Sequence, residues 1–150
     1  MIRVIPDESR TDESEEPTYE PLVLVPEGQY EVTPVRSYQG WYMGKRPDFR
    51  VQFALVSGDH QGKLLTMYRQ VKWLENSRFS VGPKSDFFRD YQACFGKQDS
   101  NVFDIGCLGN HIYLAEVENS KKDSKGRRLA EVNQYSKVVM LLDVVEEKVQ

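Results

Sequence analysis

The chain has 150 residues, of which 39% are hydrophobic and 29% are charged. This length favours one domain that buries its own core without disulfides or structural metal ions. No apolar run approaches the roughly 20 residues that a membrane-spanning helix needs. The N-terminus also lacks the apolar stretch and small-residue cleavage site of a secretory signal. We therefore expect a soluble, cytoplasmic protein with no membrane partner.

The net charge of −3 hides two regions of opposite sign. Residues 1–27 hold eight acidic and two basic side chains, a charge of −6, which leaves +3 for the rest of the chain. Residues 33–80 are the most basic part, with eight bases and three acids. A polar, acidic segment with few large apolar groups cannot offset the entropy lost on ordering. We predict a disordered acidic arm over residues 1–21 and a folded domain over residues 22–150.

Strand patterns begin at Gln29. Tyr30 and Val32 share one face of the expected strand, with Arg36 assigned to the same face. Pro34 removes a backbone donor, so the strand should bend or bulge there. Residues 38–45, YQGWYMGK, combine two glycines with three aromatic residues. This irregular composition favours a loop or a kinked strand end.

The clearest strand covers residues 49–56, where Phe and Val alternate with Arg and Gln in the period of two that is typical of a half-buried sheet. The turn SGDHQG at residues 57–62 supplies residues that accept positive φ. Residues 63–71 then form the partner strand of a hairpin. On that strand, Leu64, Thr66 and Tyr68 should share one face, and the alternate residues should share the other.

A helix is predicted from Ser85, which can cap its first turn, to Gly96, which can end it. Five apolar residues recur at helical spacing and predict a core-facing stripe: Phe87, Phe88, Tyr91, Cys94 and Phe95. Asp86 and Asp90 lie four residues apart, a spacing typical of a solvent-facing side. Cys94 and Cys107 have the spacing of neither a zinc site nor a disulfide framework, and we interpret both as small apolar residues.

Two strands follow, over residues 111–117 and 135–145, joined by the polar segment 118–128, which predicts a mobile basic loop. The element order is therefore three strands, a helix and two strands. This order resembles the OB-fold, a five-stranded Greek-key barrel with a helix between its third and fourth strands. The fold class is expected to be mainly β. In size and layout the chain is also similar to the small single-stranded-DNA-binding proteins of phages, plasmids and other mobile elements.

The resemblance implies binding of single-stranded DNA with little sequence specificity, in replication or recombination, through the second and third strands and two flanking loops. RNA is the alternative polymer. Aromatic rings would stack on bases and cations would neutralise phosphates. Trp41 could either stack on a base or cap the end of the barrel. Trp73 is expected to pack within the domain rather than to stack on a base. The candidate binding residues are Tyr38, Trp41, Tyr42, Lys45, Arg46, Arg50, Gln52, Tyr68, Arg69, Lys72, Lys121, Lys122, Arg127 and Arg128.

Other functions remain as alternatives. An OB-like barrel could instead be a protein-interaction module, an adaptor or inhibitor of a host protein, whose exposed aromatic residues anchor the partner. Oligosaccharide binding would suit the aromatic residues but not the basic loops. We expect neither an enzyme nor a cofactor, because the chain has only two histidines, His60 and His111, and no phosphate-cradling or zinc-protease motif.

The acidic arm has several candidate roles. It could keep the protein soluble, recruit a basic partner such as a replication or recombination protein, or compete with nucleic acid for the basic face of its own domain. A homo-oligomer is also compatible with the resemblance.

Overall fold

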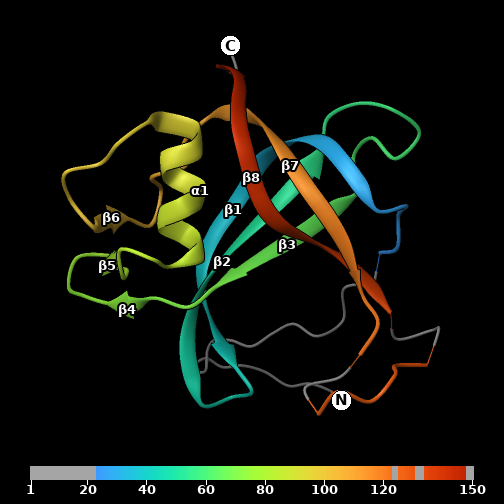
Figure 1. Ribbon diagram of the computed structural model, residues 1–150, viewed down its shortest axis with the longest axis horizontal. Helices are drawn as coiled ribbons and strands as arrows, with labels where there is room; N and C mark the ends of the chain where they lie inside the picture. The colour runs from blue at the N-terminus through green and yellow to red at the C-terminus, as the bar shows by residue number, and fades with distance from the viewer. Residues whose placement is uncertain (1–22, 123–124, 131–133, 148–150) are drawn as a thin grey trace, which may run out of the picture.

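The computed structural model describes residues 23–122, 125–130 and 134–147. The predicted arm, residues 1–21, lies outside these ranges. The described chain is mainly β and forms a closed five-stranded barrel, a small second sheet and one helix (Figure 1). No helix in this part of the chain is long and apolar enough to cross a membrane. The barrel strands are β1 (Gly28–Tyr42), β2 (Arg46–Leu55), β3 (Leu64–Arg69), β7 (His111–Ser120) and β8 (Tyr135–Glu147).

The barrel has the strand order β1-β2-β3-β8-β7 and closes where β1 pairs with β7. All neighbouring strands are antiparallel except β3 and β8, which run parallel. Residues 28–32 of β1 pair with β7, and residues 32–42 pair with β2. The register shifts between Pro34 and Arg36, as expected from the missing proline donor. The bulge therefore lies in the part of β1 that pairs with β2.

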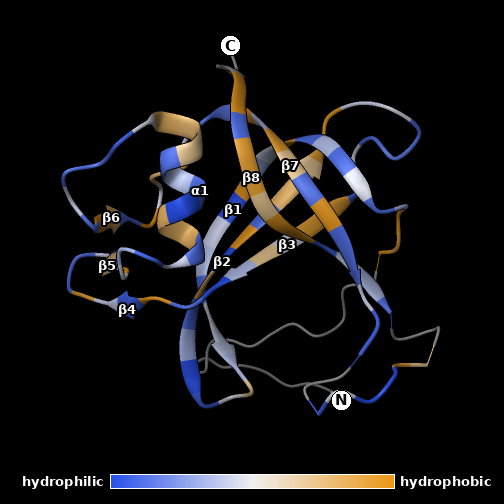
Figure 2. Ribbon diagram, in the orientation of Figure 1, coloured by the Kyte–Doolittle hydropathy of each residue, from blue (hydrophilic) through white to orange (hydrophobic). Residues whose placement is uncertain are grey.

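The alternating residues of β2 form one part of the barrel core. Phe49, Val51, Phe53 and Leu55 are all at most 2% exposed. The hairpin to β3 forms as predicted, with direct pairing from Phe49↔Arg69 to Ala54↔Leu64. Figure 2 shows hydrophobic and hydrophilic residues alternating along the barrel strands, as a sheet with one buried face requires.

Of the two interpretations of residues 38–45, a loop or a kinked strand end, the loop is wrong. Here β1 continues to Tyr42, which pairs with Arg46 at the start of β2, and the connection is only the turn of residues 43–45. The amide of Lys45 donates to the Tyr42 carbonyl at 3.0 Å, and Gly44 supplies a φ of 68°. Tight turn chemistry and continuous cross-strand pairing replace the expected loop with a hairpin that extends beyond the barrel (Figure 1).

The helix α1 (Asp86–Phe95) has the predicted bounds, with Ser85 Oγ accepting from the Phe88 amide and Gly96 at its end. Its Phe87 ring is 5.5 Å from that of Phe49, so the helix buries its aromatic face against the barrel core. The solvent-facing interpretation is wrong for Asp90, which is fully buried.

The surroundings of the helix differ from the expected layout. In the chain, the helix lies between two short strands of a second sheet. It therefore neither directly follows the third barrel strand, β3, nor directly precedes the fourth, β7. The strands are β4 (Lys72–Trp73), β5 (Arg78–Ser80) and β6 (Val102–Asp104), in the order β4-β5-β6. Two- and three-residue strands are too short to show a period of two in the sequence. Trp73 packs at this sheet, 5.5 Å from Phe79 between ring centroids, as predicted.

Candidate nucleic-acid interface

The outer face of β1, β2 and β3 carries a row of three side chains from three strands. Tyr38 pairs with Arg50, and Arg50 pairs with Tyr68, so all three point to the same side of the sheet. We call Tyr38, Arg50 and Tyr68 the central row. Tyr68 is 38% exposed, and the other two are half-buried. The row places two aromatic rings two strands apart on one surface.

A second row lies beside the central row on the same face. Arg36 pairs with Gln52, Gln52 with Thr66, and Thr66 with Lys137 of β8. Gln52 is 6% exposed, so its side chain is largely enclosed. Arg36 is exposed and offers a cation at the edge of the face. The bulge after Pro34 is what turns Arg36 outward, so its predicted position on the face of Val32 is wrong.

The hairpin extends this face beyond the barrel. Tyr42 and Arg46 pair with each other at the last position of the ladder and have the same orientation as Tyr38 and Arg50. Trp41 pairs with Pro47 and therefore lies on the opposite side of the hairpin, at 51% exposure. Lys45 is exposed in the turn. The sequence grouped Trp41 with Tyr38 and Tyr42, but the register separates them.

Three arginines of this face contact three of its tyrosines. The guanidinium carbon lies 4.0 Å from the ring centroid in Arg36–Tyr38, 4.8 Å in Arg46–Tyr42 and 4.9 Å in Arg50–Tyr68. Such cation–π contacts stabilise exposed pairs by about 0.5–1 kcal/mol each. They hold rings and positive charges together on one surface, which is the combination that stacking bases and bridging phosphates require.

Tyr68 also lies close enough to Tyr135, at the start of β8, for the two phenols to interact. Burial raises the pKa of the Tyr68 phenol and the nearby Tyr135 adds to the increase, whereas the Arg50 charge opposes it. Tyr68 therefore stays neutral at physiological pH, as a stacking surface for bases should. The sequence analysis missed Tyr135, Arg36 and Lys137. For Tyr135 and Lys137 the available signal was the period of two in β8, where both alternate with the buried Ser136 and Val138.

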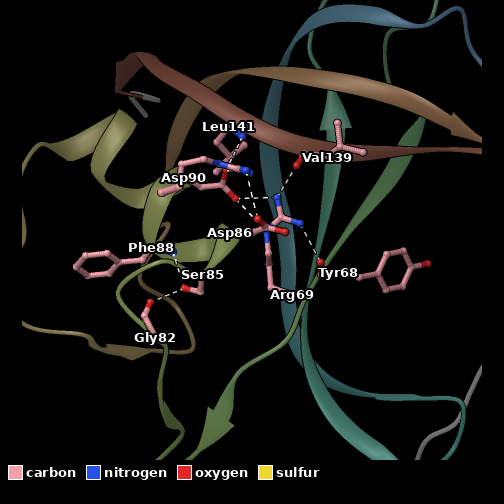
Figure 3. Close-up of polar contacts among 10 residues, drawn as sticks. Tyr68, Arg69, Gly82, Ser85, Asp86, Phe88, Asp90, Val139 and Leu141 are labelled. Carbon is pink, nitrogen blue, oxygen red and sulfur yellow. Dashed lines mark hydrogen bonds and ion pairs between the residues drawn. The ribbon is translucent and has the colours of Figure 1, made fainter.

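Arg69 does not belong to this face. It is 8% exposed on the inner side of β3, where Nε and Nη2 donate to Asp90 Oδ2 of α1 at 2.9 and 2.8 Å. Nη2 also donates to the Val139 carbonyl of β8 at 2.7 Å. Figure 3 shows the Tyr68 ring pointing away from this ion pair. The adjacent residues of β3 thus have separate roles, Tyr68 at the surface and Arg69 in the link between helix and barrel.

The remaining candidates lie on other elements. Lys72 is exposed on β4, in the small sheet. The basic segment between β7 and β8 carries Lys121, Lys122, Arg127 and Arg128, all exposed, with a backbone bridge between Lys122 and Arg128. In the view of Figure 1 this segment and the β1–β2 hairpin both lie below the barrel, the hairpin on the left and the segment on the right. The described part of the chain contains no group of three His, Cys, Asp or Glu residues arranged to hold a metal ion.

Comparison with known proteins gives no further guide to this surface. No protein-family model matches the chain, and neither a curated protein nor a solved structure shows a significant match.

Proposed function

We propose that this protein binds single-stranded DNA, with little sequence preference, across the outer face of β1, β2 and β3. The observation that carries the proposal is the central row together with Tyr42 and Arg46, which the register aligns on one face. Rings at these positions can stack on any base, because every base has a π-face. Exposed arginines beside them can contact the phosphates between the bases.

The barrel topology supports an OB-like Greek-key fold for this domain. Its sheet is closed by β1, its β3 and β8 are parallel, and a helix packs against its core. In OB-folds the second and third strands and the loops on either side of them bind oligonucleotides. Here these would be β2, β3, the β1–β2 hairpin and the β7–β8 segment. A role in protecting or presenting single strands during replication or recombination, as in phages or mobile elements, would follow from such binding.

The direct test is fluorescence anisotropy of a labelled oligo-dT of about 30 nucleotides, titrated at low and near-physiological salt with a duplex competitor. Tight binding that weakens with salt and that the duplex does not displace would support the proposal. No binding at low salt would refute it.

Two adjacent residues provide a matched pair of variants. Tyr42→Ala and Trp41→Ala each remove one exposed ring from the same hairpin, but from opposite faces. A stacked base contributes about 1–3 kcal/mol, so Tyr42→Ala should weaken binding by roughly 5- to 150-fold. Trp41→Ala should leave binding almost unchanged. Equal losses in the two folded variants would contradict the assignment of the face.

A second candidate, a protein-interaction module, is favoured by one observation. Trp41 and Met43 are 51% and 61% exposed at the hairpin tip, and Trp41 faces away from the tyrosines. Exposed Trp residues often anchor protein partners. If the wild-type protein fails to bind oligonucleotides, this side of the hairpin becomes the surface to test for a protein contact.

A further inference from the structure

Arg50 differs from the other arginines of the outer face in how its guanidinium is held. Nε donates to Asp48 Oδ1 at 2.8 Å, and Nη2 donates to the Trp41 carbonyl at 2.7 Å. The same group lies 4.9 Å from the centroid of the Tyr68 ring. Arg50 is therefore fixed by the backbone of β1, a carboxylate of β2 and an aromatic ring of β3.

Gly40 makes this arrangement possible. A Cβ atom at this position would lie 2.1 Å from Arg50 Nε and 2.6 Å from Cζ, far inside van der Waals contact. The absence of a side chain lets the guanidinium lie close to the β1 backbone, where it donates to the Trp41 carbonyl. Glycine is required here by the close approach of a side chain, and this signal is not visible in the sequence.

The positive charge of Arg50 is neutralised by a neighbouring carboxylate. Asp48 is 3% exposed and forms its ion pair with Arg50. Burial lowers the pKa of Arg50, but the hydrogen bond and charge of Asp48 outweigh this effect and raise it overall. By contrast, Arg36 and Arg46 are exposed, and within the described residues their charged groups contact tyrosine rings and no carboxylate. These two arginines can reach phosphates without first breaking an ion pair to a carboxylate of the described residues.

We infer that Arg50 is a positioning residue that holds Tyr68 as a stacking platform, and that Arg36 and Arg46 contact the phosphates. This inference rests on the proposed function. It divides the basic residues of one face into two roles that salt dependence can separate. For single strands, each phosphate contact adds about 0.7 to the slope of log Kobs against log salt. A residue that only orients a ring adds nothing to that slope.

The experiment measures oligo-dT affinity at several salt concentrations for the full chain and for Arg50→Met, Arg36→Met and Arg46→Met. Arg50→Met should weaken binding roughly 5- to 150-fold, the loss of one stacked base, with the wild-type salt slope. Arg36→Met and Arg46→Met should each lower the slope by about 0.7. A slope lowered equally by Arg50→Met would overturn the inference.

Arg50→Lys separates the charge of Arg50 from the geometry of its guanidinium, provided that circular dichroism shows both Arg50 variants to be folded like the wild type. Lysine keeps the charge but cannot bond Asp48 and the Trp41 carbonyl with one planar group. A positioning role predicts that Arg50→Lys binds almost as weakly as Arg50→Met, with the wild-type slope. Near-normal affinity in Arg50→Lys would mean that charge alone matters and would overturn the inference. Failure of the wild-type protein to bind would overturn the proposed function and this inference together, whereas a changed slope in Arg50→Met overturns only the inference.

Discussion

Replacing Asp90 by alanine should remove the central polar link between the helix and the barrel. Asp90 is fully buried, and each of its two oxygens accepts two hydrogen bonds. Oδ2 accepts from Arg69, and Oδ1 accepts from Arg89 and from the Leu141 amide of β8 (Figure 3). The substitution removes the carboxylate that is paired with the Arg69 guanidinium, which is only 8% exposed.

Breaking a buried ion pair by removing one partner costs about 3–5 kcal/mol. This is a large share of the roughly 5–15 kcal/mol that stabilises a typical domain. With a urea dependence of about 2 kcal/mol per molar, a loss of about 4 kcal/mol lowers the midpoint by about 2 M. Urea unfolding followed by tryptophan fluorescence measures this shift.

Asp86→Ala is the matched control, one helical turn earlier. The Asp86 side chain is 68% exposed and lies 3.3 Å from Arg89. Exposed pairs of this kind contribute about 0–1 kcal/mol. The double variant Arg69→Met with Asp90→Leu should regain much of the stability lost in Asp90→Ala, because apolar residues often replace a buried pair without net cost. Equal midpoints for Asp90→Ala and Asp86→Ala would refute the reasoning.

Two further predictions concern the helix and the thiols. Ser85→Ala should destabilise the domain by about 0.5–2 kcal/mol in the same urea assay, because Ser85 caps the Phe88 amide; an unchanged midpoint would argue against the cap. Burial raises the pKa of both Cys94 and Cys107 from 9.0 to about 12. Iodoacetamide at about pH 8 should therefore label the native protein far more slowly than the urea-unfolded protein, since only the thiolate reacts. Rapid labelling of the native protein would contradict the burial of the thiols. Because the folded state disfavours the thiolate, the free energy of unfolding should fall as pH rises from 9.0 towards about 12.

Local patterns in the sequence predicted the elements that repeat a simple period or end in a recognisable cap. The alternation from Phe49 to Leu55 identified both a strand and its buried face, because side chains in a strand alternate between two sides. Ser85 and Gly96 marked the ends of the helix, since capping depends on neighbouring backbone groups. The hairpin to β3 followed from turn residues with positive φ.

Other features depended on partners far along the chain. Arg69 is buried because it pairs with Asp90 of the helix. The period of two in β3 does not by itself distinguish a surface arginine from a buried one. The second sheet was missed because its strands are two or three residues long and gain stability from packing on the helix.

For the candidate site, the sequence alone determined that aromatic and basic residues are concentrated between Tyr38 and Trp73. Only the tertiary structure decided which of them share a surface. A single bulge after Pro34 shifts the alternation of β1 by one residue, which places Tyr38 beside Arg50 and Tyr42 beside Arg46 and turns Trp41 to the other side. The physical reason is that a strand's faces are fixed by its pairing with neighbouring strands, and pairing is a property of the folded sheet.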